Sequence, residues 1–89
     1  MRDKQRKTEE GELVAAAKSG HSAAFDALVM RHKRLVLAIT RRMTGSFVEA
    51  EDVSQQAFMK AFTNLSRFAG RCSFSTWVVT IAMNDMRPV

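Results

Sequence analysis

Apolar side chains recur every three or four positions between residues 50 and 65 of this 89-residue chain. Residues at that spacing share one face of an α-helix, so the segment predicts an amphipathic helix. Its apolar positions are Ala50, Val53, Ala57, Phe58, Ala61, Phe62 and Leu65. A helix with so continuous an apolar face must bury that face against other elements, and it therefore constrains the core around which the rest of the chain folds.

The opposite side of this helix carries Asp52, Gln55, Gln56 and Met59, also at helical spacing. A face exposed only to water would more often carry Lys and Glu. One acid, two amides and a thioether instead suit hydrogen bonding and adaptable packing against another protein. An ordinary surface helix face is the alternative interpretation of the same pattern.

The composition favours helices over strands. Strand-rich folds need turn residues at their connections, and this chain has four Gly and a single Pro. Hydrophobic residues make up 46% of the chain, which is typical of a folded domain. The length allows one domain. We therefore expect an all-α fold, a compact bundle of about four helices.

Two of these helices are expected before residue 45. Residues 1–8 are predicted to be a flexible charged arm. The first helix follows over residues 9–18, where acids in its first turn complement the helix dipole. The second begins near Ser22, has an apolar stripe, and stops at Gly45, because Gly readily adopts the left-handed backbone that ends helices.

The other two helices are expected to begin at serines. Ser46 and Glu49 form a capping-box signature, in which each side chain bonds the other residue's backbone N–H. This third helix reaches residues 65–66. Ser73 or Ser75 caps the fourth. The large side chains expected in the core are Phe25, Leu28, Leu35, Ile39, Phe58, Phe62, Leu65, Trp77 and Ile81.

Charge is unevenly distributed along the chain. The net charge is +5, and residues 31–44 carry five basic groups and no acid. Residues 45–66 carry three acids and one lysine, so the acidic charge lies on the third helix. This polarity suits a protein that meets a polyanion on one side and a basic protein surface on another. Simple solubility is the alternative explanation.

The segment from Phe68 to Trp77 combines aromatic rings, a cation and small hydroxyls. Stacking on a base is worth about 1–3 kcal/mol, and Arg71 supplies a phosphate contact or a stacking plane. The start of the following helix offers unpaired N–H groups to phosphate. These features predict contact with single-stranded nucleic acid. The alternative is that the rings of Phe68, Phe74 and Trp77 form the lid of the core, above all Phe68 and Trp77.

Enzymes and metal proteins are disfavoured by what the sequence lacks. It has no Gly-rich phosphate loop, no paired His for zinc and no GxSxG motif, so we expect no enzyme activity, no cofactor and no metal site. Cys72 is a lone thiol and cannot form an internal disulfide. No secretory signal is visible and no apolar run approaches the ~20 residues that span a bilayer. These observations predict a cytoplasmic protein without membrane insertion.

Several segments together carry a family resemblance. They are Phe25-Asp26-Ala27-Leu28, the run from Ala50 to Phe58, Phe68-Ala69-Gly70, and the run from Phe74 to Asn84. In this order and spacing the chain resembles region 2 of bacterial extracytoplasmic-function (ECF) sigma factors, within the sigma-70 family, over about residues 11–84. The resemblance implies a sigma region 2 helical domain over residues 9–87. It also implies that region 4, the second domain that reads the −35 element, is absent from this chain.

The resemblance further implies a transcription initiation factor domain. In the family, region 2 docks on the clamp helices of the largest catalytic subunit of RNA polymerase core. It then recognises and melts the promoter −10 element and holds a flipped base of the non-template DNA strand, which costs a few kcal/mol to extrude. The residues implied in polymerase binding are Asp52, Gln55, Gln56 and Met59. The residues implied beside DNA are Arg41, Arg42, Phe68, Gly70, Arg71, Cys72, Ser73, Phe74, Thr76, Trp77, Thr80 and Asn84. An anti-sigma factor is implied as a further partner.

This chain departs from the family pattern at two positions in these motifs. Gln56 stands where family members usually carry an acid, which lowers the charge of the docking face, and Met83 stands where a basic residue is frequent. An alternative function is therefore a sigma-like module that binds an anti-sigma factor or another regulator without engaging DNA. A general basic helical nucleic-acid binder is a third, and it predicts steep salt dependence without promoter preference.

Overall fold

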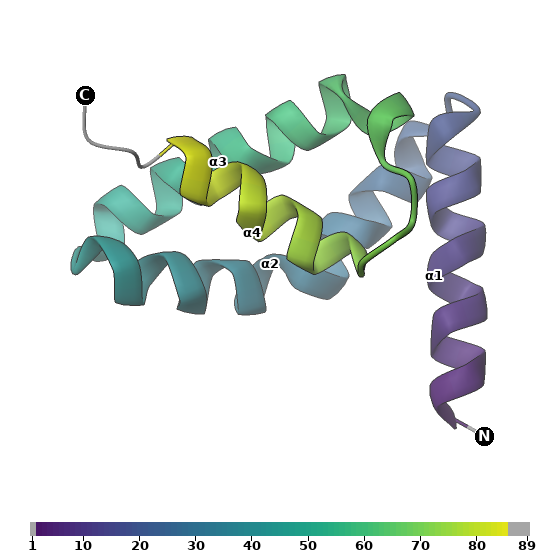
Figure 1. Ribbon diagram of the computed structural model, residues 1–89, viewed down its shortest axis with the longest axis horizontal. Helices are drawn as coiled ribbons and strands as arrows, with labels where there is room; N and C mark the ends of the chain where they lie inside the picture. Colours follow the sequence, from purple (N-terminus) through teal and green to yellow (C-terminus); the bar gives the residue numbers. More distant parts are fainter. Residues whose placement is uncertain (1, 86–89) are drawn as a thin grey trace. The chain divides into compact units, whose positions relative to one another are not determined.

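The computed structural model describes the backbone of residues 2–85 and the side chains of residues 9–85. It contains α1 (Arg2–Lys18), α2 (Ser22–Thr44), α3 (Phe47–Thr63), the short 3-10 helix η1 (Leu65–Arg67) and α4 (Phe74–Asp85) (Figure 1). No strand occurs among residues 2–85, and the predicted all-α fold with four helices is confirmed. The chain forms two units, residues 1–31 and 32–89, and α2 contributes to both.

The first unit consists of α1 and the beginning of α2. The helix α1 starts at Arg2, not at Glu9 as expected, because the Arg, Lys and Gln residues that precede Glu9 are themselves good helix formers. It ends before Gly20, whose φ of 100° lies in the left-handed region, and the Gly20 N–H donates to the Ala17 carbonyl oxygen at 3.0 Å. In this unit Ala17, Phe25 and Leu28 are buried.

The second unit is built around α3 and α4, which lie side by side (Figure 1). Both helices bury small side chains completely, and small side chains let two helix backbones approach closely. The fully buried small residues are Ala50, Ala57 and Ala61 on α3, and Val78 and Ala82 on α4. The amphipathic helix predicted from the apolar spacing is therefore present, with its alanines at the centre of the core.

The corner between α2 and α3 is formed by Gly45 and Ser46. Gly45 has a φ of 72°, as its predicted role at the helix end requires. Ser46 Oγ accepts a hydrogen bond from the Glu49 N–H at 3.4 Å, so Ser46 caps α3 as predicted. The capping box also predicts that the Ser46 N–H donates to the Glu49 side chain. In the structure this N–H donates to Thr44 Oγ1 instead, at 3.3 Å.

Two of the nine predicted core residues were placed wrongly. Leu35 and Phe62 are each 51% exposed, whereas Phe25, Leu28, Phe58 and Leu65 are buried. At 100° per residue Phe62 lies about 90° from the middle of the buried strip of α3, so it reaches only the edge of the core. On α2 the core positions are taken by Val36 and by the polar Thr40, both 0% exposed. The remaining three, Ile39, Trp77 and Ile81, are half-buried.

Candidate functional site

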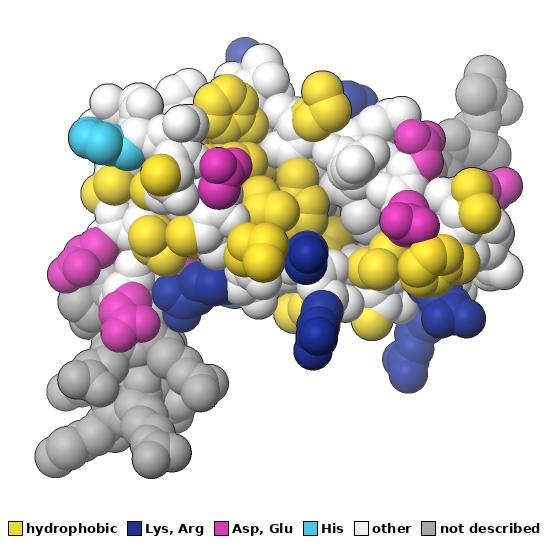
Figure 2. All heavy atoms as spheres, turned by 180° about the vertical axis from the view of Figure 1, so that it is seen from behind, with side chains coloured by type: hydrophobic (Ala, Val, Ile, Leu, Met, Phe, Trp, Pro, Cys, Tyr) yellow, Lys and Arg dark blue, Asp and Glu magenta, His cyan; other side chains and the backbone are white. Residues whose placement is uncertain are grey.

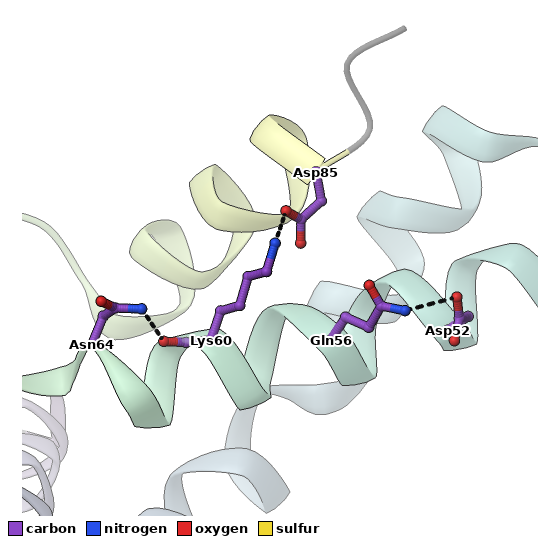
Figure 3. A network of polar contacts seen from close by, with 5 residues as sticks. All are labelled: Asp52, Gln56, Lys60, Asn64 and Asp85. Carbon is purple, nitrogen blue, oxygen red and sulfur yellow. Dashed lines mark hydrogen bonds and ion pairs between the residues drawn. The ribbon is translucent and has the colours of Figure 1, made fainter. Parts of the chain in front are cut away.

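The first candidate site is the outward face of α3, formed by Asp52, Gln55, Gln56 and Met59. All four side chains are exposed, and Met59 is 69% exposed. Gln56 Nε2 donates a hydrogen bond to Asp52 Oδ2 at 3.2 Å (Figure 3). The single carboxylate of this face is therefore oriented by an amide one helical turn away, where an acid would repel it.

This face is also more apolar than the sequence indicated. Val48 is 76% exposed and Phe62 51% exposed, and helical spacing places both on the same side of α3 as Met59. Exposed hydrophobic groups occur elsewhere too, and Figure 2 shows them next to Lys and Arg side chains on one face of the molecule. The α3 face thus combines one acid and two amides with three apolar groups, a composition suited to a protein partner.

The second candidate site is the loop between η1 and α4. The phenylalanines at its two ends, Phe68 and Phe74, belong to the core. Phe74 is 1% exposed and Phe68 6% exposed, and their rings pack edge to face with centroids 6.0 Å apart. The His32 ring lies 5.9 Å from the Phe74 ring. Trp77 packs 5.0 Å from Phe68 but is only half-buried. Of the three rings, Trp77 has the most surface available to a ligand, and Phe74 rather than Trp77 forms the lid of the core.

The exposed part of this loop runs from residue 69 to residue 73. Gly70 turns the chain with a φ of 76°. Ser73 caps α4, as one of the two predicted serines, because its Oγ accepts from the Thr76 N–H at 3.2 Å. The same hydroxyl contacts the Thr76 hydroxyl at 2.8 Å and the Ser75 hydroxyl at 3.2 Å. Arg71 and Cys72 lie between Gly70 and Ser73, and both are exposed.

A groove lies between the α4 side chains and the segment that joins α3 to η1. It has a volume of about 320 Å³, at the lower end of the range for small-ligand sites. Its lining is chemically mixed, with one aromatic ring, two amides, two cations, one carboxylate and one aliphatic group. The lining residues are Lys60, Asn64, Arg67, Trp77, Ile81, Asn84 and Asp85. Two of the predicted DNA-facing residues, Trp77 and Asn84, therefore share this groove.

The remaining predicted residues of α4 lie on its exposed surface. Thr76, Thr80 and Asn84 are exposed and follow one another at intervals of four residues, so they form one stripe. The Thr80 hydroxyl donates to the Thr76 carbonyl oxygen at 2.9 Å. The stripe lies beside the groove, since Asn84 belongs to both.

Sequence reasoning missed the α3 side of the groove, where Lys60 bridges to α4. Lys60 Nζ forms an ion pair with Asp85 Oδ1, and Asn64 Nδ2 donates to the Lys60 carbonyl oxygen at 2.9 Å (Figure 3). Among the described residues, Asp85 Oδ2 is buried without a hydrogen-bond partner. The available signal was the spacing of Lys60, Asn64 and Arg67, which puts three polar side chains on one side of the end of α3 and of η1.

Arg41 and Arg42 lie near the end of α2, away from this loop. Both are exposed near the end of α2, and the Arg41 guanidinium lies over the Phe47 ring, 5.6 Å from its centroid. His32, whose ring packs against Phe74 at the end of the loop, is nine residues before Arg41 on the same helix, about 13–14 Å along its axis. The structure therefore does not place the two arginines beside the loop.

Two features are absent from the part of the chain that the structure describes. None of its helices combines the length and the apolar character needed to cross a membrane. Nor do His, Cys, Asp and Glu side chains gather there in any group of three or more that could hold a metal ion.

The chain is similar to known proteins over most of its length. A family model described as Sigma-70 region 2 matches residues 28–87. The RNA polymerase sigma-H factor of Pseudomonas aeruginosa is 37% identical over 76 residues, which cover 85% of this chain and 39% of that protein. The ECF RNA polymerase sigma factor SigW of Bacillus subtilis is 37% identical over 71 residues, which cover 80% of this chain and 38% of that protein. The ECF RNA polymerase sigma-E factor of Escherichia coli K12 is 38% identical over 75 residues, which cover 84% of this chain and 39% of that protein. The chain spans less than two fifths of each of these relatives.

Proposed function

Because the chain belongs to the sigma-70 region 2 family, and within it resembles the ECF sigma factors, we propose that it is a transcription initiation factor domain that docks on RNA polymerase core and opens promoter DNA. The family membership confirms the resemblance inferred from the motifs. Docking on polymerase and capture of a flipped base are the parts of this proposal that the following observations support.

The outward face of α3 is the observation that carries the docking proposal. Asp52, Gln55 and Met59 lie exposed on one side of a helix whose other side is the buried core of the unit. A side chain that packing does not require is free to serve a partner. The carboxylate fits a basic protein surface, and the exposed apolar groups supply the buried area that a stable contact needs.

The groove beside α4 is the better candidate for the extruded base than the loop itself. The loop phenylalanines are buried, whereas Trp77 offers a stacking surface inside the groove. Asn64 and Asn84 place amides that can bond the edges of a base, and Arg67 can reach a phosphate. The stripe of Thr76 and Thr80 continues along α4 and would follow the neighbouring nucleotides.

A labelled chain mixed with RNA polymerase core at low salt tests the docking part of the proposal. We expect the two to co-elute in gel filtration, because charge attraction is strongest at low ionic strength. Absence of association under this condition would refute docking. The intrinsic fluorescence of Trp77, the single tryptophan of the chain, tests the DNA part. We expect a single-stranded oligonucleotide of promoter −10 sequence to quench it, since a base stacked on the indole changes its surroundings.

A regulator-binding module that never engages DNA is the second candidate function. The burial of Phe68 and Phe74 favours it, since the exposed loop then presents no aromatic ring. Trp77 fluorescence that does not respond to any single strand would support this alternative. So would any residual strand binding that Arg71→Ala leaves unchanged. Phe74→Ala is unsuitable for the comparison, because removal of a ring that is 1% exposed disrupts the core.

A further inference from the structure

We infer that Asp85 restrains nucleic-acid binding in the groove by holding the Lys60 ammonium away from the phosphate of an incoming strand. The inference rests on the proposed function, since it assigns a controlling residue to the groove in which the strand is proposed to bind. Its ligand is the phosphate backbone of single-stranded DNA.

The geometry of the ion pair carries this inference. Lys60 reaches from α3 to the end of α4, and both residues line the groove (Figure 3). The two side chains differ in exposure, since that of Lys60 is 53% exposed and that of Asp85 is 18% exposed. The ammonium is therefore accessible to a ligand, while the carboxylate that holds it is fixed in the wall of the groove.

The charges of the groove show why the pair matters for a polyanion. Lys60 and Arg67 are its cations and Asp85 is the only acid among its lining residues. With Asp85 ionised the lining carries a net charge of +1, and without that charge it carries +2. A phosphate near Lys60 must therefore compete with a carboxylate already bound to the ammonium, and it is also repelled by that carboxylate.

The buried oxygen of Asp85 explains why the carboxylate does not release Lys60 without cost. Asp85 Oδ2 has no hydrogen-bond partner among the described residues, so Oδ1 and its contact with Lys60 provide the stabilisation of the charge. A partly buried carboxylate loses stabilisation when its ion-pair partner leaves it. The carboxylate of Asp85 thus withholds the ammonium from the strand.

Binding of a fluorescently labelled thymidine oligonucleotide to the whole chain, measured over a series of salt concentrations, tests the inference. Asp85→Asn should tighten binding roughly three- to tenfold at low salt, and the log–log salt dependence should steepen by about 0.7, the value for one added phosphate contact on a single strand. Lys60→Met introduced into Asp85→Asn should remove both gains. Glu51→Gln is the control, since Glu51 is exposed on α3 and lies outside the groove.

The outcomes separate this inference from the proposed function. An Asp85→Asn variant that binds no more tightly than the original chain, or with the same salt slope as Glu51→Gln, overturns the restraint and leaves the DNA proposal standing. If no variant binds any strand at low salt, both fail. Asp85→Ala and a thermal unfolding curve for each variant show whether a loss of binding reflects unfolding, and Asp85→Ala should tighten binding in the same direction.

Discussion

The hydroxyl groups of Thr40 on α2 and Ser54 on α3 lie 3.0 Å apart in the buried core of the second unit. Thr40 Oγ1 also lies 2.9 Å from the Val36 carbonyl oxygen, to which it can donate, so it can accept from Ser54. This contact joins the helix with the proposed docking face to the helix before it. It fixes the rotation of α3, because a turn of the helix about its axis would separate the two hydroxyls.

Loss of this contact is expected to destabilise the fold. Thr40→Val keeps the shape of the side chain but leaves the Ser54 hydroxyl without the Thr40 oxygen, at a cost of about 1–3 kcal/mol in the free energy of unfolding. Urea denaturation followed by circular dichroism measures it. The double variant Thr40→Val with Ser54→Ala should recover part of the loss, since no buried hydroxyl then lacks its partner. If instead the loss of stability in the double variant equals the sum of the losses in Thr40→Val alone and Ser54→Ala alone, the two side chains do not interact.

Phe74→Ala is expected to affect folding rather than a binding surface. The ring is 1% exposed and packs against the rings of His32, Phe68 and Trp77. Removal of a buried Phe side chain costs about 3–5 kcal/mol, which is a large part of the stability of a small domain. Thermal unfolding should show a greatly lowered Tm, while Phe74→Leu retains a folded chain. A fully stable Phe74→Ala variant with impaired strand binding would contradict this assignment.

The same substitution should have opposite effects at two glycines. Gly70→Ala forces a side chain into a backbone with φ of 76° and is expected to cost about 1–2 kcal/mol, although the space around it is open. Gly11→Ala lies inside α1, also in open space, and should stabilise that helix by up to about 1 kcal/mol. Thermal unfolding of both variants measures the difference. A Gly70→Ala variant as stable as Gly11→Ala would show that the turn tolerates other conformations.

Gln56→Glu tests the unusual charge of the docking face. A glutamate four residues after Asp52 loses the amide donor and adds repulsion, which should destabilise α3 by a few tenths of a kcal/mol. Against a basic partner the added charge should tighten binding to polymerase core at low salt, and the gain should disappear at high salt. Titration of labelled chain with polymerase at two salt concentrations checks this. Affinity that is unchanged at low salt would place position 56 outside the contact.

Local patterns predicted most of the secondary structure and the orientation of α3. The period of the apolar residues predicted its buried and exposed sides, and the serines at 46 and 73 cap the helices as expected, because capping depends on a few neighbouring residues. Phe62 was misplaced because it lies at the boundary of the buried strip, where the period alone does not decide exposure.

Contacts between distant residues could not be predicted in this way. The groove depends on Lys60 and Asp85, which are 25 positions apart and meet only because α3 and α4 pack together. The pattern of apolar residues likewise could not predict the contact between the buried hydroxyls of Thr40 and Ser54, because both residues count as polar in such a pattern. Such pairs follow from tertiary packing and leave no period in the sequence.

A site-specific photo-crosslinker in place of Gln55 tests the central claim, that the outward face of α3 contacts RNA polymerase. The matched control carries the crosslinker in place of Leu35, which is 51% exposed on α2 and lies outside that face. After irradiation with polymerase core at low salt, we expect a strong crosslink from position 55 to the largest catalytic subunit and little from position 35. Equal crosslinking from the two positions, or none from position 55 in a sample that co-elutes with polymerase, would contradict the account.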